Sequence, residues 1–177
     1  MMGSAAAILS FEEFEQLPGQ PGKQELIDGE LIEMPPPKLR HSLIQRRLFR
    51  LVEEYLTAHP DLGEAFFEAG FRLGLQNWVQ PDVSVVSAQQ IREAGEYLQG
   101  APAIAIEVIS RSSNAETVDG KIAHYFGHGG LEVWVLYPKT RRVWVYHRDG
   151  TAAEHRDRIR SSVRPGFEAD LAVVLAA

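Results

Sequence analysis

The stretch AIAIEVIS, residues 103–110, is an apolar, partly β-branched run of strand length with one acid inside it. Such a run is typical of a strand that is covered on both faces. The acid is Glu107, and a carboxylate taken out of water must be paired, hydrogen-bonded or bound to a cation. Alternate residues of a strand share a face, so we expect Glu107 to lie on the face of Ala105 and opposite Ile106.

A second acid, Asp82, lies in a similar apolar run, VQPDVSVV at residues 79–86. Pro81 fits the first residue of a strand, because proline has no backbone donor. Taken alone, Pro-Asp is more simply a turn. For Glu107, two interpretations carry equal weight: a metal ligand, or an acid at an exposed strand end that is paired with an arginine such as Arg111.

Lys121 follows the central strand on a segment with helical periodicity. It lies beside Tyr125, at the margin of an apolar stripe formed by Val118, Ile122 and Phe126. The commoner explanation is a surface lysine that keeps its ammonium group in water. The alternative is an ammonium group aimed at Glu107, which the short strand-to-helix link allows. Under both interpretations, Lys121→Met is expected to change stability little.

The remaining chain alternates between strand-like and helix-like segments, which predicts one mixed α/β domain over residues 1–177. Capping boxes at residues 10–13 and 113–116 open two helices, the second ending at about residue 126. Asp28-Gly29 indicates a hairpin over residues 25–34. The other expected elements are a helix at 41–57, one or two strands at 64–75, a short helix ending at 94, a loop at 97–102, a β-meander at 131–147 and a strand at 171–175.

Composition narrows the class of protein. The chain has 177 residues and no cysteine, which excludes disulfides and thiolate zinc sites. It has no apolar stretch long enough to span a bilayer and no secretory signal, so we expect a cytoplasmic protein without a membrane partner. The net charge of −6 argues against a protein that coats nucleic acid non-specifically. An enzyme with a local basic patch and a bound divalent cation is still compatible with that charge.

Six motifs occur in order between about residues 25 and 147. They are ELIDGE at 25–30, the prolines before His41, QPDV at 80–83, IEVIS at 106–110, DGKIAHY at 119–125 and GLEVWVLYP at 130–138. As a set they resemble the Uma-two family of the restriction-endonuclease-like, PD-(D/E)XK superfamily. The resemblance implies a central mixed β-sheet flanked by helices, with a core at about residues 23–147. It also implies a phosphodiesterase site that depends on Mg²⁺ or Mn²⁺.

Carried over to this sequence, the resemblance makes Asp82 and Glu107 metal ligands, with the Val108 carbonyl as a further oxygen ligand. The superfamily places a lysine two residues after the second acid, but this position is Ile109 here, so Lys121 would take the catalytic role. The accessory candidates are Glu25, His41 and Tyr125. For His41, which could bind a phosphate or cap the chain entry to a helix, we favour the structural role.

The expected function is a Mg²⁺-dependent nuclease that hydrolyses phosphodiester bonds in DNA or RNA, with DNA the favoured substrate. A nuclease fold without catalysis, kept for binding protein or nucleic acid, is the competing class. A basic groove beside the two acids would favour the nuclease, and an apolar patch without a metal cavity would favour the binding module. A hydrolase of a small phosphorylated substrate is a third hypothesis, recognisable by a narrow closed pocket. Assembly as a homodimer stays open.

Overall fold

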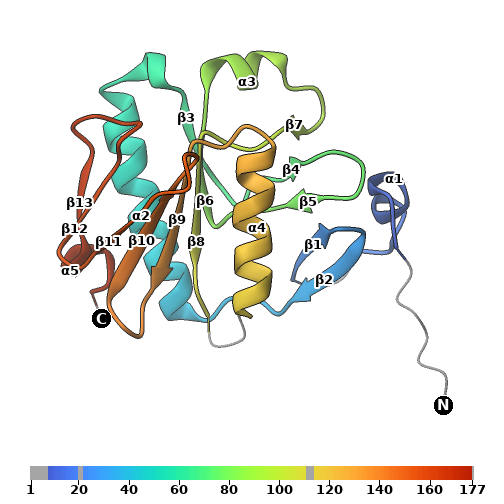
Figure 1. Ribbon diagram of the computed structural model, residues 1–177, viewed down its shortest axis with the longest axis horizontal. Helices are drawn as coiled ribbons and strands as arrows, with labels where there is room; N and C mark the ends of the chain where they lie inside the picture. Colours follow the sequence, from blue (N-terminus) through green and yellow to red (C-terminus); the bar gives the residue numbers. More distant parts are fainter. Residues whose placement is uncertain (1–7, 20–21, 111–113, 177) are drawn as a thin grey trace.

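A six-stranded mixed sheet forms the centre of the protein in the computed structural model, which describes residues 8–19, 22–110 and 114–176 (Figure 1). The strand order is β11-β10-β9-β8-β6-β3, with β8 parallel to β9 and every other pair antiparallel. The strands are β3 (Glu64–Phe67), β6 (Val83–Val86), β8 (Ile104–Val108), β9 (Glu132–Tyr137), β10 (Arg142–His147) and β11 (Ala152–His155). The predicted central mixed sheet is thus confirmed, with β8 between β6 and β9.

Two helices cover opposite faces of this sheet, α2 (Leu39–Thr57) and α4 (Ala115–Gly127) (Figure 1). The apolar stripe of α2 packs against the β8 face that carries Ile104, Ile106 and Val108. Tyr125 of α4 packs on the other face with Ala105. The alternation predicted for the central strand is therefore confirmed, and Glu107 belongs to the α4 side.

A second sheet, with the order β2-β1-β5-β4-β7, lies beside α4. Its strands are β1 (Lys23–Ile27), β2 (Glu30–Met34), β4 (Phe71–Arg72), β5 (Trp78–Val79) and β7 (Leu98–Gln99). The expected hairpin is confirmed: Asp28 and Gly29 have φ values of 51° and 78°, the left-handed pair that a tight two-residue turn needs. The expected loop at 97–102 was wrong in part, because β7 pairs there with β4.

The C-terminal segment departs from the sequence-based expectation. It forms β12 (Arg158–Arg160), β13 (Glu168–Asp170) and the short helix α5 (Leu171–Val174), so the strand expected at 171–175 was wrong. Asp170 caps α5 by accepting a hydrogen bond from the Ala172 N–H at 2.7 Å. Leu171 and Val174 are buried on one face of this turn. A short apolar run does not distinguish helix from strand, and here the cap decides.

One buried acid of the sheet has a structural role. Glu132, at the start of β9, accepts hydrogen bonds from Trp134 Nε1 at 2.9 Å, Ser161 Oγ at 2.8 Å and the Ser162 N–H at 2.7 Å. These bonds offset the cost of burying its charge and fasten the segment after β12 to the sheet.

The remaining helices are α1 (Phe11–Glu15), η1 (Pro60–Leu62) and α3 (Ala88–Glu93). The capping box of α1, with Ser10 and Glu13, is confirmed. The second expected box begins at Ser113, which lies outside the described residues; α4 is capped by Asn114, which accepts a hydrogen bond from the Glu116 N–H. No helix in the described part of the chain is long and apolar enough to cross a membrane.

Candidate active site

Asp82 and Glu107 meet at one end of the central sheet. Asp82 directly precedes β6, and β6 runs antiparallel to β8 with Val83 opposite Ile106, so Asp82 lies beside the last residues of β8. The Val108 N–H donates to Asp82 Oδ2 at 2.6 Å, so the carboxylate takes the position where the backbone ladder stops. The start of one strand and the end of its neighbour therefore bring the two acids together.

Lys121 is buried between two carboxylates. Its Nζ lies 2.6 Å from Glu107 Oε1 and 2.9 Å from Glu25 Oε1, and the residue is only 6% exposed. One turn further along α4, the Tyr125 hydroxyl donates to the same Glu107 oxygen at 2.7 Å. The interpretation of Lys121 as a surface residue was wrong, and its ammonium group is aimed at Glu107. Arg111, the alternative partner for Glu107, lies outside the described residues.

The hairpin of β1 and β2 contributes an acid and a second lysine. Glu25 Oε1 accepts a hydrogen bond from the Gln80 N–H at 2.8 Å in addition to its contact with Lys121. The Nζ of Lys23 lies 3.6 Å from Glu25 Oε1 and 3.6 Å from Asp82 Oδ1. Three carboxylates, from β1, β8 and the residue before β6, thus share two ammonium groups.

The α2 helix approaches Asp82 from the other side. His41 Nε2 lies 3.4 Å from Asp82 Oδ1, and Gln45 Nε2 donates to the same oxygen at 2.9 Å and to Glu68 Oε1 at 3.1 Å. The helix begins at Leu39 with Lys38 as its N-cap, so His41 does not cap the chain entry. Gln45 Oε1 is buried and has no hydrogen-bond partner among the described residues.

Opposing effects set the protonation of the acids. Burial raises the pKa of Asp82, but the hydrogen bond from His41, the charge of Lys23 and the Val108 N–H outweigh it and hold the pKa at about 2. For Glu107, burial and the charges of Asp82 and Glu25 prevail over the two lysines and raise the pKa above its usual range. Of the three acids in this cluster, Glu107 is thus the one with a raised pKa, whereas the pKa values of Asp82 and Glu25 are lowered.

The donors of the site keep their protons at neutral pH. Burial lowers the pKa of Lys121, but the carboxylates of Glu107 and Glu25 reverse this effect and raise it, so the ammonium group stays charged. Burial raises the pKa of Tyr125 well above its usual value, and Glu107 raises it further, so the phenol remains a donor. Burial also raises the pKa of Glu25, but the two lysines outweigh it and lower the pKa.

Sequence reasoning missed three members of this cluster, namely Lys23, Gln45 and Glu68. Lys23 lies two residues before Glu25 on the same strand, so it shares that face. Gln45 lies four residues after His41 on the same helix face. Both spacings were readable in the sequence. Glu68 follows β3 with a φ of 49° and carries no comparable signal.

The cluster offers oxygen ligands and fixed donors, which are the groups that hard cations and phosphate esters use. Among residues 8–19, 22–110 and 114–176, no three carboxylate or imidazole groups already surround a single point as metal ligands do. Lysine ammonium groups lie between the acids instead. Metal ligation by Asp82, Glu107 and the Val108 carbonyl therefore stays a prediction.

Comparisons with known proteins identify the family and the fold of this chain. The chain is similar to a solved structure from Anabaena variabilis, described as a "putative nuclease belonging to DUF820", with a TM-score of 0.85 and 22% sequence identity. The match covers 95% of this chain and 98% of that one, and at this identity it shows the fold. None of the curated proteins matches the chain. The family model of Uma2, described as "Putative restriction endonuclease", matches residues 11–174. The chain therefore belongs to the Uma2 family, as its motifs predicted.

Proposed function

We propose that this protein is a metal-dependent nuclease that hydrolyses phosphodiester bonds in DNA at the cluster of Asp82, Glu107 and Lys121. The observation that carries the proposal is the burial of the charged Lys121 between Glu107 and Glu25, in the cluster that also contains Asp82. A buried ion pair is an inefficient way to stabilise a fold. A fixed cation beside two acids is what phosphoryl transfer requires. Membership of the Uma2 family supports the nuclease role.

The donor set fits a hard divalent cation, Mg²⁺ or Mn²⁺. Carboxylates prefer such ions, and the site brings three of them, Asp82, Glu107 and Glu25, into one cluster. Gln45 Oε1 supplies an unpartnered buried oxygen next to Asp82. Asp82, Glu107 and the Val108 carbonyl would hold the ion. When bound, the metal lowers the pKa of a water and offsets charge on the reacting phosphate.

The side chains of the protein have separate tasks in this proposal. Lys121, charged at neutral pH, donates to the attacking water or to a non-bridging phosphate oxygen. Glu25 is a positioning residue, because it accepts a hydrogen bond from the Lys121 ammonium group at 2.9 Å. Tyr125 orients Glu107, and Gln45 orients Asp82.

The test is cleavage of labelled single- and double-stranded DNA and RNA with Mg²⁺ or with EDTA. Wild type should cleave only with the metal, and Glu107→Gln should be slower by roughly two to three orders of magnitude, the scale for losing one charged group at the reacting centre. Glu30→Gln, an exposed acid on the same hairpin as Glu25, is the matched control and should cleave like wild type. Circular dichroism would verify that each variant is folded.

One observation favours the alternative of a non-catalytic module. The two lysines already offset much of the charge of the acids, as they would in a site that no longer binds metal. That alternative predicts wild-type cleavage no faster than that of Glu107→Gln, and this result would overturn the nuclease proposal.

A further inference from the structure

We propose that the phosphate backbone of DNA docks on a basic rim beside the acidic cluster, formed by Lys38, Arg40, Lys139 and Arg141. All four side chains are exposed. This inference rests on the proposed nuclease function, because the rim would present substrate to that site. It assigns the side of the molecule over which the DNA lies.

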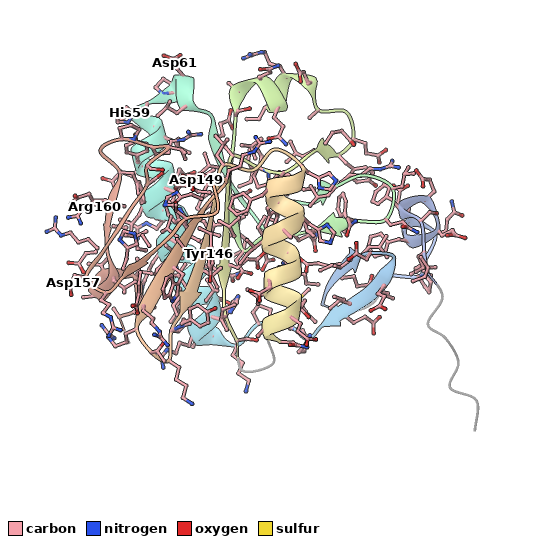
Figure 2. The ribbon with its side chains drawn as sticks, in the orientation of Figure 1. His59, Asp61, Tyr146, Asp149, Asp157 and Arg160 are labelled. Atoms are coloured by element: carbon pink, nitrogen blue, oxygen red, sulfur yellow. The ribbon has the colours of Figure 1, made fainter. Side chains whose placement is uncertain are left out.

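The first half of the rim is fixed by α2. Lys38 is the N-cap of this helix and Arg40 lies in its first turn. The next residue is His41, whose Nε2 is 3.4 Å from Asp82 Oδ1. Lys38 and Arg40 are therefore at the end of the sheet that carries the acids. His59 and Asp61 follow the opposite end of α2, at the upper side of the view in Figure 2.

The second half is the turn between β9 and β10, which holds Lys139 and Arg141. Because β8 and β9 are parallel, with Val108 opposite Leu136, both strands end at the same edge of the sheet. Adjacent strands lie about 5 Å apart, so the turn begins roughly one to two strand spacings from the end of β8. Figure 1 shows this turn and the start of α2 together at the lower end of the view.

The charge distribution is unusual for a chain of net charge −6. Residues 35–52 contain five Lys and Arg and no Asp or Glu, and residues 133–148 contain four Lys and Arg and no acid. None of the four rim residues forms an ion pair with another residue in the described part of the chain. Arg142 is not part of the rim, because its Nη1 lies 3.4 Å from Glu154 Oε1 and the two residues form an ion pair. Exposed cations without acidic partners are free to neutralise phosphates and release counterions.

The opposite side of the site is acidic. Glu30 and Glu33 are exposed on β2, and Glu116 is exposed in the first turn of α4. Like charges there would repel a polyanion. The backbone is therefore expected to lie over α2 and the β9–β10 turn rather than over the hairpin. The rim supplies a local basic surface that the acidic overall composition does not reveal.

The test measures DNA binding by fluorescence anisotropy with EDTA present, using labelled single- and double-stranded oligonucleotides over a salt series. One variant carries Lys38→Gln and Arg40→Gln, and another carries Lys139→Gln and Arg141→Asn. Asparagine is chosen because Arg141 has a φ of 52°, which asparagine tolerates. The matched control is Arg92→Gln with Arg148→Gln. Both arginines are exposed, on α3 and after β10, at the other end of the sheet.

Each rim pair should weaken binding about tenfold at low salt. It should also reduce the slope of log K against log salt by about 1.8 on duplex or about 1.4 on single strands, the values for two lost phosphate contacts. The control pair should change binding less than about twofold, and all three variants should melt like wild type. Rim variants that bind as tightly as the control pair, or a wild type that binds neither form of DNA, would overturn the rim.

The same variants separate the two proposals in a cleavage assay. If wild type binds DNA through the rim but does not cleave it, the nuclease proposal fails and the rim stands. If wild type cleaves DNA and the rim pairs bind and cleave like the control pair, the rim fails and the nuclease stands.

Discussion

Replacement of Lys121 by methionine tests whether the site is held together by its buried charges. The Lys121 ammonium group lies 2.6 Å from Glu107 Oε1 and 2.9 Å from Glu25 Oε1. Methionine keeps the packing of the stem but removes this charge. Glu25 retains Lys23 at 3.6 Å, whereas Glu107 keeps only the neutral Tyr125 hydroxyl at hydrogen-bonding distance among the described residues. Most of the cost should therefore fall on Glu107.

The expected loss of stability is large. Removal of one partner of a buried ion pair costs about 3–5 kcal/mol. For a chain of this size, 1 kcal/mol shifts Tm by about 2–4 °C, so Lys121→Met should melt roughly 6–20 °C below wild type at pH 7. This result differs from the sequence-based expectation of little change, which assumed a solvent-exposed ammonium group.

The loss should depend on pH. Without Lys121, the pKa values of Glu107 and Glu25 rise in the folded state above their values in the unfolded chain. Such carboxyls bind protons on folding, so they stabilise the fold at low pH and lose this contribution as pH rises. The gap between variant and wild type should therefore shrink at pH 5, and Glu107→Gln should restore part of the stability at pH 7.

Thermal melts by circular dichroism at pH 5 and pH 7 measure this effect, with the exposed Lys139→Met as the control. A Tm of Lys121→Met within about 2 °C of wild type at pH 7 would show that the buried charge of Lys121 does not hold the site together. So would a deficit that is equal at both pH values.

Three further predictions concern metal binding, the lowered pKa of Asp82 and the buried acid Glu132. In differential scanning fluorimetry, Mg²⁺ or Mn²⁺ should raise Tm, and at 100 times Kd the stabilisation should be about 2.7 kcal/mol. Asp82→Ala should abolish this rise. No rise in wild type would argue against a metal site. The fall in the pKa of Asp82 from 3.8 to about 2 is worth about 2 kcal/mol, present above about pH 4 and lost as pH falls toward 2. Urea unfolding should therefore show a gap between wild type and Asp82→Asn that closes at low pH, and a constant gap would contradict this. Glu132→Gln should lower the free energy of unfolding by about 2–3 kcal/mol, because several donors lose a charged acceptor. The folded variant should still cleave DNA like wild type. A slower rate would place Glu132 in the mechanism.

Some of this arrangement was readable in the sequence because it depends on local periodicity. The apolar run at residues 103–110 marked a strand covered on both faces, and its alternation placed Glu107 on the correct side. The family motifs then identified Asp82 and Lys121 as its neighbours. The turn at Asp28-Gly29 was also predictable, because this residue pair favours the left-handed backbone conformation of a two-residue hairpin turn.

The remaining features depend on tertiary contacts. A helical wheel gives the direction of the Lys121 side chain but not its burial. The second sheet, which contributes Glu25 from β1, determines that burial. Glu68 joins the cluster only because Gln45 crosses from α2. The two strands between residues 64 and 75 look like one hairpin in sequence, yet β3 and β4 belong to different sheets.

In the proposed mechanism, Asp82 and Glu107 bind a metal that supports phosphodiester hydrolysis. The most direct measurement is a crystal structure with Mn²⁺ and a non-cleavable phosphorothioate oligonucleotide, with anomalous scattering used to locate the ion. We expect an anomalous peak between Asp82 and Glu107, with the Val108 carbonyl among its ligands and the Lys121 ammonium group facing the scissile phosphate. Lys121 and Lys23 still paired with the acids, and no peak at saturating Mn²⁺, would contradict this mechanism.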